Sequence, residues 1–367
     1  MKVLIVDTNP MIYDGIFSAI MNYAENIDKT DLTIDFVAIN SNVEKSIKKR
    51  INELGSNLYI LEERNSRTLN YIRKLSKLIR GNHYNLVHAH GSSCTLVTEL
   101  IASALANTPC CPHSHNTNCQ HKVAHRLLKP LFCVLYRSGF ACGEEAGKWL
   151  YGNRNFVVLN NGINVDRFAF SLEDRGIYRE KYGINSEDTV LIHIAHFTET
   201  KNHKFLIDCY DELLKKSSNY KLLLIGQGVK EFDIRRLVKK KQIEDKVIFI
   251  GTTMSIPELL SASDIMVLPS LYEGFPFTTV EAQASGIRCI VSDAVTMKCK
   301  MTENFTFVSL EKDKWVDEII RSSTKYDRVV ACNNAKKAIS DSGYYIKTNV
   351  NKLKVCYEKF GKKNDKL

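Results

Sequence analysis

The feature that most constrains the fold of this chain is a regular alternation of short apolar segments with amphipathic helical segments. Alternation of this kind is typical of βαβ units, in which a helix joins two parallel strands. It predicts an α/β fold with doubly wound parallel sheets. In the first half of the chain the predicted strands are Val3–Asp7, Ile34–Ala38, Leu58–Leu61, Leu86–His88, Cys110–His113 and Phe156–Leu159, and helices are predicted at Ile16–Asn26 and Leu69–Arg80.

The length of the chain favours two domains. A chain of 367 residues is too long for one ordinary core and suits two domains of about 150–200 residues each. The turn-rich segment Asn160–Asn164 follows a predicted strand and marks a boundary. After it, a helical pattern over Asp166–Tyr182 leads into the second half, where strands are predicted at Val190–Ala195, Leu222–Ile225 and Val247–Gly251.

The composition and the N-terminal sequence indicate where in the cell the protein is expected. No apolar run approaches the ~18–20 residues that span a bilayer, and the N-terminus MKVLIVDTNP lacks the pattern of an export signal. The eleven cysteines include no C-x-x-C pair, which argues against a zinc or thioredoxin-like motif and for reduced structural thiols. We therefore expect a cytoplasmic protein.

The formal net charge of +10 indicates an anionic partner. Nucleic acid, an acidic membrane and phosphorylated substrates all qualify, but no nucleic-acid reader motif is present. The segment His121–Arg137 combines an apolar and a basic face, and Pro130 is expected to kink or split it. Such a helix fits an anionic membrane surface, and it fits equally an ordinary half-buried position in a domain.

The stretch Asp264–Asp293 carries the most specific pattern. It predicts a strand, a loop, a helix over Thr278–Ser285 and a second strand, with Gly286 at the helix stop. The start of that helix would present unpaired backbone N–H groups, which suit an anion. Glu281 on its first turn is placed to accept hydrogen bonds from sugar hydroxyls. Alternatively, Thr278 and Glu281 form a capping box that satisfies only their own helix.

The sequence EGFPFTTVEAQASG within this stretch resembles the E-x7-E signature of retaining glycosyltransferases of family GT4, which have the GT-B fold and act in capsule and exopolysaccharide synthesis. The resemblance implies two Rossmann-like domains facing a cleft. Residues 1–165 would form the acceptor-side domain and residues 166–341 the nucleotide-sugar-binding domain. Residues 342–367 would form a C-terminal helix that crosses back to the first domain.

The resemblance also implies roles for single residues around the signature. Glu273 would contact the hydroxyls of the donor sugar as a catalytic residue, and Glu281 would hold the ribose. Between them, the backbone N–H groups of Phe275 and Phe277 would approach the sugar or the diphosphate, and Gly274 and Pro276 would also line the donor site. Thr278 and Thr279 would add hydroxyl donors to phosphate.

A second matching segment is HFTETKNH, after the strand Val190–Ala195. GT4 proteins carry G-R-x(4)-K-[GN] here, and Lys201 and Asn202 match it. Lys201 would stabilise the departing diphosphate as a catalytic residue. His196 occupies the arginine position and is a weaker, pH-dependent substitute. In the following Gly-Gln-Gly loop, Gly226 and Gly228 permit close backbone approach to a ligand.

The first half lacks the G-x-G-x-x-G of dinucleotide-binding folds, so a Rossmann dehydrogenase is not expected. It departs from the GT4 pattern because it offers only Gly15, assigned to the donor site, where GT4 proteins have two adjacent glycines. The segment Asn160–Asn164 resembles the family hinge, so Asn161 and Gly162 would line the cleft and bind the donor.

The histidines of His88-Ala-His90 and His113-Ser-His115 follow predicted strands. The resemblance places His115, with a near-neutral pKa suited to proton transfer, near the transferred sugar as a catalytic residue. For His88 and His90 we expect structural hydrogen bonds. Although His-x-His can bind a metal, no carboxylates accompany these histidines, and no metal site is expected.

Together these features predict transfer of a hexose or N-acetylhexosamine, with retained configuration, from a nucleotide sugar. The donor is expected to be a UDP-sugar and the acceptor a polyprenyl-linked saccharide. No cofactor beyond this co-substrate is expected. Two alternatives stay open, a non-catalytic nucleotide-sugar-binding subunit and a nucleotide-sugar 2-epimerase or sugar phosphorylase of the same fold.

Overall fold

The computed structural model describes residues 1–361, which divide into two compact units. Unit 1 contains Met1–Ile163 together with the chain from Gly343 onward, and unit 2 contains Asn164–Ser342. Within the described residues, every helix is too short or too polar to cross a bilayer. All eleven cysteines are free thiols, as expected.

Unit 1 is built on a seven-stranded sheet in the order β3-β2-β1-β4-β5-β6-β7, and neighbouring strands are parallel. In chain order the strands are β1 (Lys2–Asp7), β2 (Thr33–Ala38), β3 (Leu58–Ile60), β4 (Leu86–Gly91), β5 (Cys110–Ser114), β6 (Phe140–Ala141) and β7 (Val157–Val158). The helices are α1 (Gly15–Asn26), α2 (Lys45–Glu53), η1 (Glu62–Arg64), α3 (Thr68–Gly81), η2 (Cys94–Leu96), α4 (Val97–Leu105), α5 (Lys122–Leu135), α6 (Glu144–Tyr151) and α14 (Ile346–Phe360).

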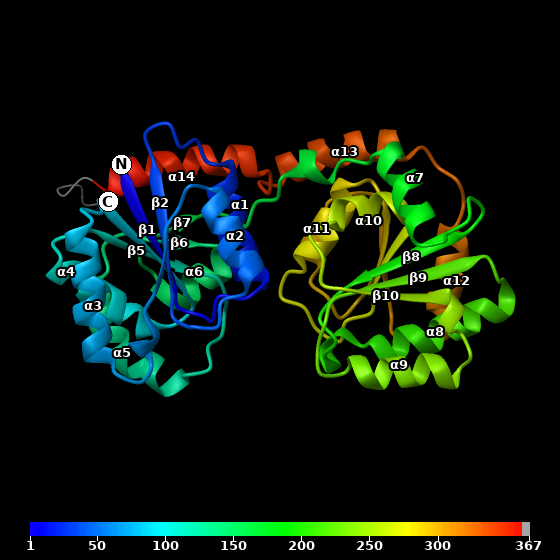
Figure 1. The fold of residues 1–367 in the computed structure, drawn as a ribbon, viewed down its shortest axis with the longest axis horizontal. Helices are drawn as coiled ribbons and strands as arrows, with labels where there is room; N and C mark the ends of the chain where they lie inside the picture. The colour runs from blue at the N-terminus through cyan, green and yellow to red at the C-terminus, as the bar shows by residue number, and fades with distance from the viewer. Residues whose placement is uncertain (362–367) are drawn as a thin grey trace. The chain divides into compact units, whose positions relative to one another are not determined.

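Helices cover both faces of this sheet (Figure 1). Helices α1, α2 and α14 pack on one face, and α3 and α4 pack on the other. The strands are continuous apolar runs because both of their faces are buried, as Val3 and Leu4 of β1 show. The last helix, α14, lies beside α1 and contributes Leu353, Tyr357 and Phe360 to the core of unit 1.

Unit 2 has the same layered plan on a six-stranded parallel sheet, in the order β10-β9-β8-β11-β12-β13. Its strands are β8 (Thr189–Ile194), β9 (Tyr220–Ile225), β10 (Val247–Gly251), β11 (Ile265–Leu268), β12 (Arg288–Ser292) and β13 (Phe305–Val308). Its helices are η3 (Val165–Phe168), α7 (Leu172–Lys181), η4 (Glu199–Lys201), α8 (His203–Lys216), α9 (Glu231–Lys240), η5 (Glu244–Lys246), α10 (Ile256–Ala262), α11 (Phe277–Ala284), η6 (Met297–Cys299), α12 (Lys312–Ser322) and α13 (Arg328–Asp341).

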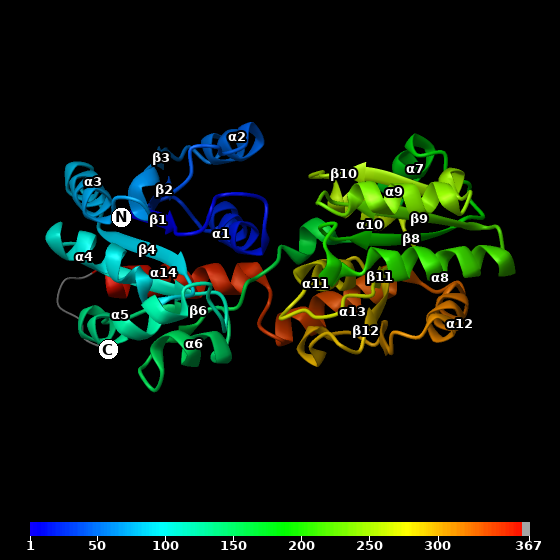
Figure 2. The same cartoon turned by 90° about the horizontal axis from the view of Figure 1, so that it is seen from below.

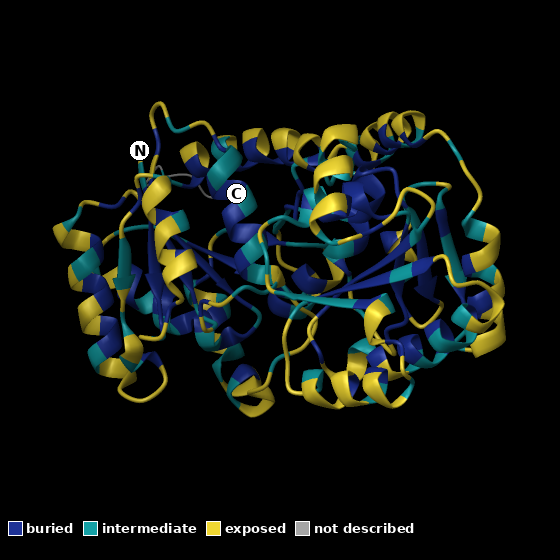
Figure 3. Cartoon of the chain, turned by 45° about the vertical axis from the view of Figure 1, so that its right-hand side comes forward, coloured by how far each residue is buried: buried dark blue, intermediate teal, exposed yellow. Residues whose placement is uncertain are grey.

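Figure 2 shows the sheet of each unit between its helices, and Figure 3 shows buried strands beneath helices with exposed outer stripes. In unit 2, α8, α9 and α12 cover one face of the sheet. In each sheet the chain first adds strands on one side of its first strand and then on the other side. This reversal lies between β1 and β4 in unit 1 and between β8 and β11 in unit 2. In open parallel sheets such switch points are where ligands bind, beyond the carboxyl ends of the strands.

Several local expectations are corrected by the structure. Helix α5 runs through Pro130 without splitting, and Pro130 lies on the exposed side of the helix. The segment from Asp166 to Tyr182 is a 3-10 turn and a separate helix, because Ser171 caps α7 by accepting from the backbone N–H of Asp174. Strand β4 continues past His88 to Gly91. The sequence did not predict strands β6 and β13. Both strands are short, and they lie near or at one edge of their sheets.

Candidate active site

The strongest candidate site lies in unit 2, at the switch point between β8 and β11. Lys201 closes the 3-10 turn η4 that follows β8, and Glu273 lies in the loop that follows β11. The two loops are joined by a backbone hydrogen bond of 2.8 Å from the Leu271 N–H to the Thr200 carbonyl. The fold therefore brings together two residues that are 72 positions apart in the sequence.

Lys201 and Glu273 form an ion pair. The Lys201 ammonium donates to Glu273 Oε1, and the Ser270 hydroxyl donates to the same oxygen at 2.8 Å. The side chain of Lys201 is 24% exposed and that of Glu273 is 13% exposed. A ligand can therefore reach the pair, although most of the surface of both side chains is buried. The second carboxylate oxygen of Glu273 remains able to accept from ligand hydroxyls. Ser270 is a contact that the sequence did not reveal.

Helix α11 presents an uncapped N-terminus beside this loop. It begins at Phe277 after Pro276, and no side chain caps it. Thr278 therefore lies inside the helix, and the capping-box alternative for Thr278 and Glu281 is wrong. The first N–H groups of the helix and its dipole favour a bound anion. Gly274 is exposed, and the rings of Phe275 and Phe277 contact each other with centroids 5.2 Å apart.

Glu281 is half-buried on α11. Its backbone carbonyl accepts from the Ser285 N–H, but its carboxyl makes no hydrogen bond or ion pair among the described residues. Burial raises the pKa of its carboxyl to about 7, although the positive charge of Arg167 acts in the opposite direction. Arg167 belongs to η3, which packs against α11. Sequence reasoning missed this neighbour, because nothing in the motif links it to Glu281. A carboxyl without a protein partner is available to a ligand.

The two glycines of the Gly-Gln-Gly loop are required by contacts within the chain. Gly226 and Gly228 have φ angles of +135° and +157°, and an added Cβ would lie 2.1 Å from the Ala195 carbonyl oxygen and 2.6 Å from the Phe197 carbonyl oxygen. Only glycine lets this loop pass so close to the segment after β8. On that segment His196 is exposed, and its Nδ1–H donates to the Gln227 carbonyl at 3.2 Å. Asn202 adopts the left-handed conformation that links η4 to α8, with φ of 54°.

The hinge candidates of unit 1 have contacts of their own. A Cβ on Gly162 would lie 2.9 Å from the Cα of Ile346, so glycine allows α14 to begin close to this segment. Asn161 is buried, and its Oδ1 has no hydrogen-bond partner among the described residues.

Gly15 is the exposed first residue of α1, and the preceding Asp14 caps that helix. No contact of Gly15 distinguishes it as a binding residue.

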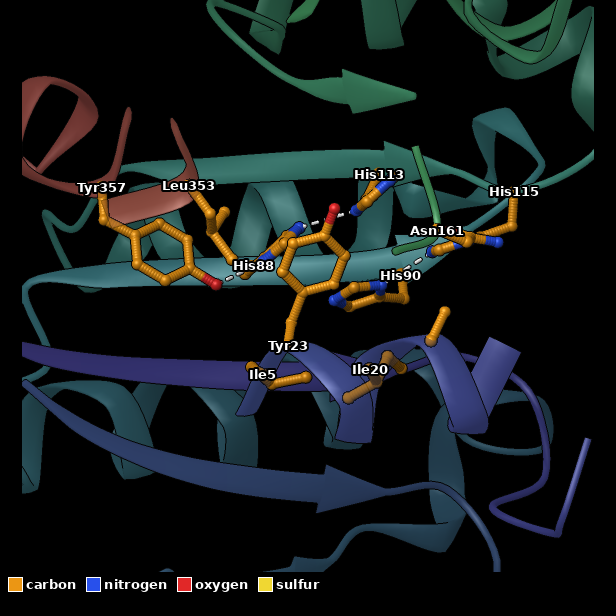
Figure 4. Close-up of a pocket in the computed structure, with 11 residues that line it drawn as sticks. Ile5, Ile20, Tyr23, His88, His90, His113, His115, Asn161, Leu353 and Tyr357 are labelled. Carbon is orange, nitrogen blue, oxygen red and sulfur yellow. Dashed lines mark hydrogen bonds between the residues drawn. The ribbon is translucent and has the colours of Figure 1, made fainter. Parts of the chain in front are cut away.

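The four histidines at the ends of β4 and β5 form two hydrogen-bonded pairs in unit 1, and their rings contact one another (Figure 4). His88 shares hydrogen bonds of 2.7 Å with the Tyr357 hydroxyl and 3.1 Å with His113, and His90 shares one of 2.8 Å with His115. The near-neutral pKa expected for His115 is wrong, because burial lowers it to about 3. His115 is thus a neutral imidazole, able to donate or accept one hydrogen bond at each nitrogen but not to carry a positive charge at neutral pH.

Comparison with known proteins agrees with this arrangement. The family model described as glycosyl transferases group 1 matches residues 174–337. EpsF of Bacillus subtilis, which is named as a glycosyltransferase, is 30% identical over 365 residues, covering 94% of this chain and 93% of EpsF. The UDP-Gal:alpha-D-GlcNAc-diphosphoundecaprenol alpha-1,3-galactosyltransferase of Escherichia coli is 24% identical over 302 residues, covering 77% of each chain.

Among solved structures, Anabaena HepE in complex with UDP superposes with a TM-score of 0.75 at 17% sequence identity, covering 98% of this chain and 100% of HepE. That likeness confirms the predicted fold. The identity to EpsF over nearly the full length of both chains decides the family. The chain therefore belongs to the group 1 glycosyltransferases, family GT4, and has the GT-B fold.

Proposed function

We propose that this glycosyltransferase transfers a hexose or N-acetylhexosamine from a UDP-sugar with retention of anomeric configuration. The observation that carries the proposal is the Lys201–Glu273 ion pair beside the uncapped N-terminus of α11, at the switch point of unit 2. The E. coli relative is named for UDP-Gal, and HepE was solved with UDP. These names support UDP as the nucleotide.

The donor would be held by complementary groups of unit 2. The diphosphate would lie between the Lys201 ammonium and the first N–H groups of α11, where both the side-chain charge and the helix dipole favour an anion. Glu273 would accept from the sugar hydroxyls. Glu281, which has no protein partner among the described residues, would accept from the ribose hydroxyls.

The reaction breaks the bond between the anomeric carbon and the diphosphate oxygen. A new bond forms to an acceptor hydroxyl oxygen, and the proton of that hydroxyl leaves with the nucleotide diphosphate. Negative charge grows on the diphosphate as the bond breaks, so preplaced positive charge lowers the barrier. Lys201 and the N–H groups of α11 would supply that charge, and we propose that the step needs no metal ion.

The proposed acceptor is a polyprenyl-linked saccharide of exopolysaccharide, capsule or O-antigen synthesis. The name of the E. coli relative includes a diphosphoundecaprenol-linked acceptor. Such a lipid lies in the membrane, so the enzyme would work at its cytoplasmic face.

The outer face of α5 supports this location. Its exposed large apolar residues recur at helical spacing and are Val123, Leu127, Leu131 and Val134. Exposed basic residues flank this row, namely Lys122, Arg126 and Arg137. His125 and Phe132 are buried on the opposite side, so α5 is anchored in unit 1 while presenting an apolar and basic surface, as interfacial helices do.

The test is a transfer assay with a panel of UDP-, GDP- and ADP-sugars, a polyprenyl-diphosphate-linked saccharide and EDTA. We expect product from a UDP-sugar only, and loss of product in Lys201→Ala. Tight UDP binding without turnover on any acceptor would instead favour a non-catalytic binding subunit. Conversion of the UDP-sugar without an acceptor would favour an epimerase.

A further inference from the structure

The histidine group of unit 1 encloses a small cavity that the proposed donor site does not use. His88 and His90 come from β4, His113 from β5 and His115 from the residue after it. The cavity has a volume of about 10 Å³, and Tyr23, Asn161 and Tyr357 also line it. Figure 4 shows the rings of both strands gathered around this space.

Four polar atoms at the cavity are buried without a hydrogen-bond partner among the described residues. They are His90 Nε2, His113 Nε2, His115 Nδ1 and Asn161 Oδ1. A buried polar atom that is left unpaired is destabilising, so such atoms are rare and call for a bound ion or water. Finding four of them around one cavity indicates that a ligand is held there.

We propose that this cavity binds one transition-metal ion of the Zn²⁺ class, with His90 Nε2 and His113 Nε2 as its imidazole ligands. Asn161 Oδ1 would be the third ligand. Ligand nitrogens of His88, His90 and His113 all lie within 4.8 Å of one another. Two nitrogens on a tetrahedral zinc ion are about 3.4 Å apart, so the histidines are gathered near the spacing that one zinc ion requires.

The chemistry of the ligands selects the class of metal. Neutral imidazoles suit Zn²⁺, Ni²⁺ and Cu²⁺, whereas Mg²⁺ and Ca²⁺ require carboxylate or other oxygen ligands. Of the His, Cys, Asp and Glu side chains among the described residues, only histidines gather here, and Asn161 would add a single amide oxygen.

The hydrogen bonds behind the two ligands fit metal binding. A metal-bound histidine normally donates its other N–H to an acceptor, which fixes its tautomer. With Nε2 on the metal, His113 Nδ1–H donates to His88 Nε2, and His88 Nδ1–H donates to the Tyr357 oxygen. Likewise His90 Nδ1–H donates to His115 Nε2. Both chains of hydrogen bonds can adopt this direction together, which leaves the Nε2 atoms of His90 and His113 unprotonated and the His115 Nδ1–H as a buried donor without an acceptor among the described residues.

A single buried water is the competing occupant, since the cavity volume and the number of polar partners also suit a water. The two occupants differ in a measurable way, because a water gives no saturable metal binding. The proposed ion lies wholly in unit 1 and uses none of Lys201, Glu273 and Glu281. Failure of the donor-site proposal would therefore leave the metal proposal standing, and the reverse is also true.

The test uses the untagged full-length protein after removal of metals. Calorimetric titration with Zn²⁺ is expected to show one saturable site per chain, and titration with Mg²⁺ none. Co²⁺ in place of Zn²⁺ is expected to give visible absorption bands of a low-symmetry site. Absence of stoichiometric Zn²⁺ binding would overturn the proposal in favour of the water.

Variants locate the site. His90→Gln and His113→Gln are each expected to weaken Zn²⁺ binding by more than about 100-fold. Tyr357→Phe removes only the hydroxyl that hydrogen-bonds His88 behind the ligand His113, and is expected to weaken binding less, by about 10-fold. His203→Gln is the matched control, because His203 is also buried with unpaired ring nitrogens but belongs to unit 2. Binding that persists in both ligand variants, or that is lost in His203→Gln, would contradict the assignment. Circular dichroism of each metal-free variant checks folding, and Tyr357→Phe serves if a histidine variant does not fold.

Discussion

The ammonium of Lys201 donates to the carboxylate of Glu273, so in unit 2 the cation proposed to bind the diphosphate is already paired with the anion proposed to bind the sugar. Donor binding would then be an exchange of partners. The diphosphate would take Lys201, and Glu273 would turn to the sugar hydroxyls. This arrangement keeps both charges satisfied in the free protein while leaving both available to the donor.

The exchange predicts opposite effects for the two members of the pair. Lys201→Ala is expected to weaken UDP binding by more than about ten-fold, because a charge-assisted contact is lost. Glu273→Gln is expected to leave UDP binding unchanged or stronger, because Lys201 loses its competing partner, while transfer from the UDP-sugar falls by about 100-fold or more. Calorimetry with UDP and initial transfer rates measure the two effects. Equal loss of UDP affinity in both variants would contradict the exchange.

Glu281→Gln tests the ribose contact. We expect UDP affinity to fall by about ten-fold and the melting temperature of the free protein to stay the same or rise, because the Glu281 carboxyl caps no helix and makes no hydrogen bond among the described residues. Thermal melts and UDP titrations of the same samples give both quantities. A lower melting temperature with unchanged UDP affinity would show that Glu281 stabilises the fold and does not contact UDP.

The raised pKa of Glu281, about 7, predicts a pH dependence of UDP binding. The carboxylate accepts hydroxyl hydrogen bonds better than the neutral acid, so affinity is expected to rise between about pH 6 and about pH 8. The stability of the folded protein is expected to change with pH in the opposite direction. Because the folded-state pKa lies above the unfolded value, this group's contribution to stability is present at low pH and is lost as pH rises through about 7. Both dependences are expected to be smaller in Glu281→Gln, and an unchanged pH profile of UDP binding in that variant would exclude Glu281 as its source.

A pair of glycine substitutions tests the packing of the Gly-Gln-Gly loop. Gly228→Ala is expected to destabilise the protein by about 2 kcal/mol or more, since the new methyl group would meet the Phe197 backbone and the φ of +157° disfavours alanine. Gly176→Ala is the control. Gly176 lies inside α7 with open space around it, so alanine is expected to stabilise by about 0.5–1 kcal/mol. Denaturant unfolding measures both changes, and a neutral Gly228→Ala would refute the packing argument.

A matched pair of surface leucines tests the membrane surface proposed for α5. Leu127 and Leu172 are both 75% exposed, but only Leu127 lies in the apolar row of α5. Leu127→Glu is expected to reduce co-flotation with vesicles that contain phosphatidylglycerol, and Leu172→Glu is expected to leave it unchanged. Added salt should weaken binding of the unaltered protein, because the flanking basic residues contribute through charge. Equal flotation of both variants would count against α5.

The sequence sufficed for the parallel α/β plan and for most elements, because alternating apolar segments and turn residues are local signals. It failed where the structure depends on distant parts of the chain. No local sequence signal indicates that Tyr357 hydrogen-bonds to His88, 269 residues away. Nor does any local signal indicate that His115 is buried and that its pKa is lowered as a result. In the same way, the motif identified Lys201 and Glu273 but not their ion pair.

The measurement that tests the central proposal most directly is calorimetric titration of the purified protein with UDP, GDP and ADP in the presence of EDTA. We predict saturable binding of UDP in preference to the other two nucleotides, and its loss in Lys201→Ala. Absence of binding to any nucleotide, or UDP binding that Lys201→Ala leaves unchanged, would contradict the donor site proposed for unit 2.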